Sequence, residues 1–262
     1  MGKGIKLYWK HVQIHLHSMM QYKVSFFMTA VGQFLTSFSV FLGMFFMFQR
    51  FHMVDNYTYG QCLLCYAVTL AAFTMAEVFF RGFDTFASCI ANGEFDRMML
   101  RPKGLIFQVI CKKVELTKVG RLLQAVVIFC YAIPNCGVEW NGMKIMGLIF
   151  MLIGGTVVFS SLFIVHAAIC FFTLEGLEIV NIFTYGGQEF GKYPYGIYGK
   201  RVLAICTYLI PYALFQYYPF LYLIGHRTEI WYLFLPLVSC IFVIPCLLLW
   251  RFGVRHYKST GS

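Results

Sequence analysis

Glu77, Arg81 and His166 are the ionisable side chains of this chain whose position inside or beside long apolar runs could support chemistry. Glu77 precedes Arg81 by four residues, which is the favourable order for an ion pair on a helix. An ionisable side chain within a transmembrane segment is a functional candidate by default. The spacing predicts a Glu77–Arg81 pair, and it leaves open whether Glu77 anchors the fold or works in transport. For His166 we expect a hydrogen bond to a neighbouring side chain rather than a proton relay.

No catalytic residue is predicted, because the sequence contains no P-loop, no H-E-x-x-H and no G-x-S-x-G. The ten cysteines are scattered through apolar runs, where Cys behaves as a small hydrophobic residue. Cys62 and Cys65 form a lone C-x-x-C with no second pair or His cluster beside it, so no metal site is expected. With so few intramembrane charges, the chain has little means of using an ion gradient. If it moves a substrate, we expect the energy to come from another subunit.

The elements that hold these groups are membrane helices. The chain of 262 residues is 60% hydrophobic and 12% charged, with a mean hydropathy of +0.70, whereas soluble domains carry about 25% charged residues. The pattern predicts an all-α polytopic membrane protein, a single domain over residues 1–262 with six transmembrane helices. An amphipathic interfacial helix is expected at residues 3–22, a cytoplasmic segment at 81–113, and spans at about 24–49, 62–80, 114–133, 145–173, 202–225 and 230–250.

Two of these spans are irregular. The third reaches a spanning length only if Lys118 and Arg121 extend along the helix toward the interface. The fifth contains Pro211 and Pro219, and prolines within a span require the freed backbone groups to be satisfied by neighbours or a cavity. A broken or re-entrant element is therefore predicted there.

A charged island at residues 80–121 lies between the apolar spans and holds eight Lys and Arg residues and four acids. Its centre reads GEFDRMMLRPK, from Gly93, a helix-stop signal, to the Pro102–Lys103 pair. Between them the sequence predicts a short helix. One side carries the apolar group Phe95, Met98 and Met99, and the other carries Asp96, Arg97 and Arg101.

The basic residues predict the orientation. The N-terminus, the charged island, the 174–201 loop and the C-terminus together hold all of the 21 Lys and Arg residues except Arg50, Lys144 and Arg227. Because basic residues concentrate on the cytoplasmic side, these four segments are predicted to be cytoplasmic. We therefore expect a multi-pass protein of the cytoplasmic (inner) membrane. The net charge of +10 follows from this rule, and no nucleic-acid partner is expected.

The centre of the island resembles the cytoplasmic signature of a permease family in the ABC-2 superfamily, whose members are exporters driven by a separate ATPase. The later pieces KYPYGIY (192–198), IPYA (210–213), Tyr218-Pro219 and LIG (223–225) are similar to that family in order and spacing. Lys192 stands where the family is expected to favour Arg. The resemblance covers essentially the whole chain, including the N-terminal interfacial helix and the six spans.

The resemblance implies a permease that pairs with a second, identical or homologous permease and with two ATPase subunits. No cofactor is expected on the chain itself, since ATP and Mg would bind in the ATPase; membrane lipids are the remaining partners. The short helix would be a coupling helix that moves with the ATPase and tilts the bundle. The coupling residues are expected to be Gly93, Glu94, Phe95, Asp96, Arg97, Met98, Arg101 and Pro102.

The expected function is the transmembrane subunit of an ATP-driven exporter for an amphipathic or hydrophobic substrate. A path between two permeases, lined by the first, second and fifth spans, would include Phe34, Phe38, Tyr208 and Tyr212. Two other readings remain open at this point. One is a membrane-embedded enzyme that modifies lipids, and the other is a scaffold or channel subunit without energy coupling.

Overall fold

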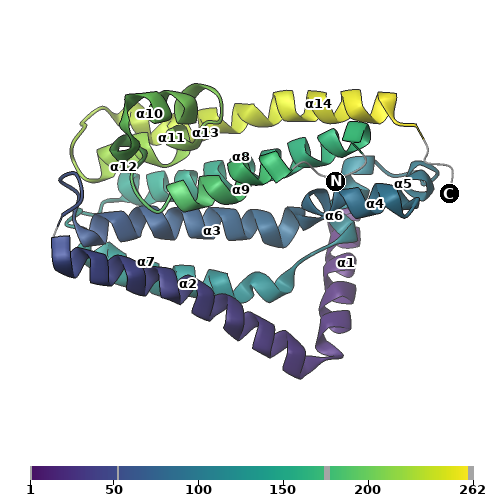
Figure 1. Ribbon diagram of the computed structural model, residues 1–262, viewed down its shortest axis with the longest axis horizontal. Coiled ribbons are helices and arrows are strands. Elements are labelled where there is room, and N and C mark those ends of the chain that lie inside the picture. Colours follow the sequence, from purple (N-terminus) through teal and green to yellow (C-terminus); the bar gives the residue numbers. More distant parts are fainter. Residues whose placement is uncertain (1, 52, 174–177, 259–262) are drawn as a thin grey trace.

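A computed structural model of the chain describes residues 2–51, 53–173 and 178–258. It is a bundle of α-helices, and the described residues contain no β-strand beyond an isolated bridge between Val54 and Tyr57. Figure 1 shows the long helices running side by side along the longest axis. We call the end that holds residues 81–118 and the C-terminus the charged end. The opposite end, where residues 53–58, 136–141 and 225–229 connect the helices, is the loop end.

Helix α3 (Tyr59–Asp84) is the centre of the bundle, and it packs against α7 (Val119–Asn135) and α8 (Gly142–Thr173). It begins with a capping box in which the Thr58 and Gln61 side chains and backbone amides satisfy each other. Its apolar residues continue around the whole helix, as expected of a helix that is enclosed by others. Its most apolar window is 83% buried.

Five stretches of the described chain are long and apolar enough to cross a membrane, which agrees with an all-α polytopic protein. The first is α2 (Lys23–Phe51), and the last joins α13 (Leu235–Ser239) to α14 (Val243–His256). The full set is Lys23–Phe51, Tyr59–Ala91, Leu116–Asn135, Gly142–Thr173 and Ile230–His256. The third, Leu116–Asn135, lies close to the predicted 114–133, and the 3-10 turn Leu116–Lys118 leads into α7.

The predicted fifth span is not one helix. Residues 202–225 form α10 (Gly199–Tyr208), α11 (Tyr212–Phe215) and α12 (Tyr217–Leu223), with one break at Pro211 and the other at Gln216, whereas Pro219 lies inside α12. The break was expected at Pro211, because proline lacks the amide proton that a continuous helix needs. The long element in this region is instead α9 (Glu178–Phe190), which lies along α8 and points toward the loop end (Figure 1).

The path of α9 corrects part of the predicted orientation. Residues 191–201 were expected to lie with the charged island, yet Thr69 in the middle of α3 donates a hydrogen bond to the Gly191 carbonyl. Tyr193 reaches Met47 near the end of α2, and α10 lies in the loop-end half (Figure 1). Lys192, Lys200 and Arg201 are therefore not at the charged end. Residues 174–177 of the predicted loop lie outside the described residues.

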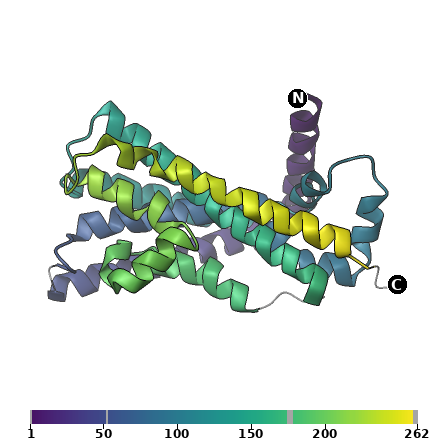
Figure 2. The same cartoon turned by 90° about the horizontal axis from the view of Figure 1, so that it is seen from above.

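The interfacial helix and the island form a separate layer at the charged end. Helix α1 (Gly2–Met20) stands across the long axis of the bundle in both views (Figures 1 and 2). It contacts α6 (Leu105–Lys112), which follows α4 (Phe86–Ala91) and α5 (Glu94–Met99). Gly82 lets α6 approach α3, because an added Cβ would lie 2.1 Å from the Val109 carbonyl oxygen. Gly120 does the same for α2 and α7, where an added Cβ would lie 1.9 Å from the Ala30 carbonyl oxygen.

Candidate functional site

A buried charge cluster joins three helices near the charged end. Its acid, Glu77, has a fully buried side chain on α3, and Arg81 lies one turn further along the same helix. Lys118 ends the 3-10 turn before α7, and Arg121 lies in the first turn of α7. We define the buried charge cluster as Glu77, Arg81, Asp84, Lys118 and Arg121. Lys118 and Arg121 come from the segment that begins the third span, and the other three residues lie on α3.

Three cations contact the same carboxylate. Arg121 Nη1 donates a hydrogen bond of 2.9 Å to Glu77 Oε2. Lys118 Nζ lies 3.1 Å and Arg81 Nη1 3.5 Å from Glu77 Oε1. The cation side chains are themselves only 12–20% exposed. Burying a lone carboxylate would be very costly, and this arrangement offsets the cost with close opposite charges.

Arg81 extends the cluster to a third helix. Its Nη1 lies 2.5 Å from Asp84 Oδ2 and donates a 2.6 Å hydrogen bond to the hydroxyl of Tyr185 on α9. Helices α3, α7 and α9 are therefore fastened to one another through a single carboxylate and its partners. A relative shift of α3 and α7 would separate buried opposite charges, and a shift of α9 would break the hydrogen bond between Arg81 and Tyr185.

The predicted Glu77–Arg81 pair forms, but the prediction for Lys118 and Arg121 was wrong. They were expected to extend toward the interface, and they turn inward to Glu77 instead. The missed signal was the combination of one acid near the end of the second span with two cations at the start of the third. The sequence places Glu77, Lys118 and Arg121 near the same end of their predicted spans. It does not show that the two helices touch at that end.

The short helix predicted between Gly93 and Pro102 forms as α5, and Gly93 precedes it in a left-handed conformation with φ of 64°. The apolar face of α5, however, points inward. Phe95 is fully buried and Met98 is 8% exposed. Phe95 makes edge contacts with Phe86, Phe171 and Tyr257, with ring centroids 4.9–5.4 Å apart. The expectation that Phe95 and Met98 are anchors for a partner is therefore corrected, because both side chains are part of the protein core.

The exposed part of this segment is the turn that follows Met98. Leu100 is 86% exposed, and Met99 is 43% exposed beside it. Arg97, Arg101 and Pro102 are exposed as well. We define the exposed turn as residues 99–103, with Arg97 just before it on α5. It presents two apolar side chains between cations, and it is held in place from beneath by Phe95.

Two acidic side chains of α5 also interact with other parts of the chain. Glu94 forms an ion pair with Lys112 of α6, with 2.5 Å between Oε2 and Nζ. Asp96 lies near Tyr257 of the C-terminal segment, and the pKa of the Tyr257 hydroxyl is raised first by burial and then by the Asp96 carboxylate. Helix α5 is thus connected to α6 on one side and to the C-terminal segment on the other.

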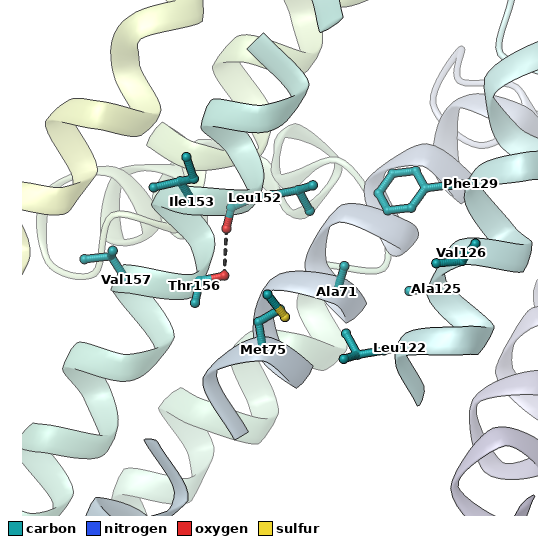
Figure 3. A pocket seen from close by; sticks show the side chains of 10 residues that line it. All are labelled: Ala71, Met75, Leu122, Ala125, Val126, Phe129, Leu152, Ile153, Thr156 and Val157. Atoms are coloured by element: carbon teal, nitrogen blue, oxygen red, sulfur yellow. Dashed lines mark hydrogen bonds between the residues drawn. The ribbon is translucent and has the colours of Figure 1, made fainter. Parts of the chain in front are cut away.

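An apolar groove of about 590 Å³ opens on the side of the bundle between α7 and α8, with α3 as its floor (Figure 3). Its only hydroxyl, that of Thr156, donates a hydrogen bond to the Leu152 carbonyl of its own helix. The groove can therefore hold hydrocarbon but offers no free polar group for chemistry. Its lining consists of Ala71, Met75, Leu122, Ala125, Val126, Phe129, Leu152, Ile153, Thr156 and Val157.

The four aromatic residues predicted to line a substrate path are not brought together. Phe34 and Phe38 stack on each other along α2. Tyr212 is buried, stacks on Tyr195 and donates its hydroxyl proton to the Phe183 carbonyl. Tyr208 is 88% exposed on α10. Tyr212 therefore packs in the core, and in Figure 1 helix α3 lies between α2 and the α10–α11 region.

The remaining candidates carry no chemistry in this arrangement. His166 is 7% exposed, and among the described residues its Nδ1 has no hydrogen-bond partner. Cys62 and Cys65 are buried free thiols. No group of three or more metal-ligating side chains occurs in the described part of the chain.

Comparison with known proteins gives one finding. A family model described as "ABC-2 family transporter protein" matches residues 34–261, which is well over half of the chain. No curated protein and no solved structure matches the sequence. The match begins within α2 and covers the buried charge cluster, the exposed turn and the apolar groove.

Proposed function

The chain belongs to the ABC-2 family of transporter proteins, and from this premise we propose that it is the membrane subunit of an exporter driven by a separate ATPase. The family is one of multi-pass transport proteins, which favours transport over a lipid-modifying enzyme. In this proposal the charged end faces the cytoplasm of an inner membrane, because the N-terminal helix, the island and the C-terminus concentrate basic residues there. ATP and Mg bind in the partner, and a second permease completes the complex with two ATPase subunits.

The exposed turn is the observation that carries this proposal. Leu100 and Met99 provide an apolar contact at the charged end of the bundle, and Arg97 and Arg101 flank them. Apolar side chains at the centre of an interface supply affinity, while charges at its rim set register and association rate. We propose that this turn, rather than Phe95 and Met98, contacts the ATPase.

The packing beneath the turn gives a route for motion. Phe95 contacts Phe171 of α8, and Phe171 contacts Trp250 of α14 with centroids 5.1 Å apart. Through the Glu94–Lys112 pair and the close approach at Gly82, α5 is also linked to α6 and α3. Closely packed side chains move as units rather than deforming continuously. A displacement of the turn by the ATPase would therefore be passed to the long helices.

Purification from native membranes tests the proposal. We expect a nucleotide-binding protein to co-purify with the wild-type chain and to be lost from the Leu100→Asp variant, because a carboxylate replaces the apolar contact. Met53→Asp is the matched control, since Met53 is also an exposed apolar side chain (57%) but lies at the loop end. Retention of the ATPase by Leu100→Asp, or its absence from the wild-type preparation, would contradict the proposal.

For the cargo we propose an amphipathic or hydrophobic molecule whose apolar part enters the groove between α3, α7 and α8. The nearly pure hydrocarbon lining supports this class, because apolar burial requires no specific polar partner. The end of the groove at Met75 and Leu122 lies at the same level along α3 and α7 as Glu77 and Arg121. The residues Phe34, Phe38 and Tyr208 remain candidates for a path that a second permease would complete.

Filling the groove tests the cargo class. We expect Val126→Trp to reduce labelling of the groove by a photoreactive diazirine fatty acid several-fold, because the indole occupies the space between α7 and α8. Val127→Trp should leave the labelling unchanged, since Val127 is similarly exposed (50% against 56%) but does not line the groove. Labelled peptides are identified by mass spectrometry. Equal labelling in both variants would rule out the groove as the apolar site.

A further inference from the structure

A second cavity, of about 340 Å³, lies at the charged end where α1 meets the segment from α5 to α6. We call it the basic pocket. Three of its lining side chains are basic, Arg101, Lys103 and Lys112, and α1 adds the imidazoles of His11 and His15. No acidic side chain lines it within the described chain. Among the described residues, Glu94 forms an ion pair with Lys112.

The walls of the basic pocket are fixed by hydrogen bonds. His15 Nε2 lies 3.0 Å from the Cys111 carbonyl oxygen, to which it donates, and this joins α1 to α6. Gln108 donates from Nε2 to the carbonyl oxygens of Met98 at 3.0 Å and Lys103 at 2.8 Å. These bonds hold the turn that carries Arg101 and Lys103 above α6. The cations therefore face a preformed cavity rather than lying on a flexible loop.

The lining of the pocket is amphipathic. Leu7 and Ile14 of α1 and Phe107 of α6 form apolar walls beside the cations. A small hydrated anion would need only the basic side, and a hydrocarbon chain only the apolar side. The combination fits a molecule that carries both an anionic group and an apolar chain.

The position of the pocket identifies the source of such a molecule. Helix α1 lies across the bundle axis, as a helix in the plane of a membrane surface would (Figures 1 and 2). Ile5, Trp9 and Leu16 are exposed on it, which is typical of interfacial helices. At this level the bilayer presents phosphate headgroups, and basic pockets near the membrane surface bind anionic lipids.

We propose that the basic pocket binds the headgroup of an anionic phospholipid. The phosphate lies among Arg101, Lys103 and Lys112, and the first part of an acyl chain lies against Leu7, Ile14 and Phe107. The bound lipid connects α1 to the segment that carries the exposed turn. The site forms within a single permease chain and does not need the ATPase, although it shares Arg101 and Lys103 with the exposed turn.

The test uses the purified permease without any ATPase, in a neutral detergent. Native mass spectrometry measures retention of phosphatidylglycerol, phosphatidylcholine and, as a soluble phosphate, glycerol 3-phosphate. We expect retention of phosphatidylglycerol alone. The Lys103→Gln/Lys112→Gln variant should lower that retention about tenfold, as expected for the loss of two cations near a lipid phosphate.

The matched control is Lys10→Gln/Lys113→Gln, which removes the same charge outside the pocket; Lys113, like Lys112, pairs with a glutamate. Retention in the control should stay near the wild-type value. The single variant Lys103→Gln breaks no ion pair found in the described residues, and it should weaken retention even if the double variant does not fold. Phe107→Asn keeps all the charges and should also lower lipid retention.

Three results would overturn the inference. Equal losses in the pocket and control variants would indicate non-specific attraction to basic residues. Binding of glycerol 3-phosphate as strong as that of the lipid would indicate a site for free phosphate. Equal retention of phosphatidylcholine and phosphatidylglycerol would show that the anionic headgroup is not recognised. Each result is obtained without the ATPase, so it is distinct from a failure of the proposed export function.

Discussion

Replacing Glu77 by Gln is expected to destabilise the protein by about 3–5 kcal/mol, the usual cost of removing one partner from a buried ion pair. The change leaves Arg81, Lys118 and Arg121 close together with only Asp84 to balance them. Their side chains are at most 20% exposed, so water screens the repulsion poorly. The expected result is a large fall in the apparent melting temperature of the detergent-purified protein.

Glu94→Gln is the control for this prediction. Glu94 also pairs with one lysine, but its side chain is 36% exposed, and exposed pairs contribute only about 0–1 kcal/mol. Adding Lys118→Met to Glu77→Gln should recover part of the loss, because it restores the net charge of the buried cluster. Equal melting temperatures for Glu77→Gln and Glu94→Gln would show that the cluster does not hold α3, α7 and α9 together.

Phe95→Ala should have the second large effect, a loss of about 3–5 kcal/mol as measured for buried Phe in other protein cores. Phe95 is fully buried among Phe86, Phe171 and Tyr257, so its removal leaves a cavity under the exposed turn. Met99 is the last residue of α5 and is 43% exposed, so Met99→Ala should change the free energy of unfolding little. Thermal unfolding followed by circular dichroism measures both variants.

The two variants also separate a structural role from a docking role. If Phe95 faced a partner instead of the core, Phe95→Ala would weaken partner binding and leave the melting temperature unchanged. We expect instead that Phe95→Ala lowers the melting temperature, and that any weaker partner binding is a consequence of this loss of stability. Met99→Ala should instead weaken partner binding without a change in the melting temperature.

The long spans could be predicted from sequence because hydropathy and length decide them. Helices α2, α3 and α8 lie close to their predicted ranges, and Pro211 correctly predicted a break. Helix α9 could not be predicted from hydropathy and length. It contains Glu178, Asn181 and Glu189, and this composition is too polar for a hydropathy criterion to select. Its packing along α8 depends on tertiary contacts instead.

The candidate sites were predicted less well than the spans, for a physical reason. An apolar stripe on a six-residue helix such as α5 can face either its own core or a partner, and the pattern is the same in both cases. Phe95 and Met98 were therefore assigned to the wrong surface, while Leu100 received no role. Likewise, Lys118 and Arg121 lie 41 and 44 residues from Glu77, and their contact follows from how α3 and α7 cross.

The most direct measurement of the central claim is a photo-cross-link from the exposed turn. A benzoylphenylalanine placed at Leu100, in cells that also express the native ATPase, should give a cross-linked product that contains permease and ATPase. The same residue placed at Met53, at the loop end, should give none. A cross-link to the ATPase from position 53 but not from position 100 would contradict the assignment of the charged end as the ATPase contact.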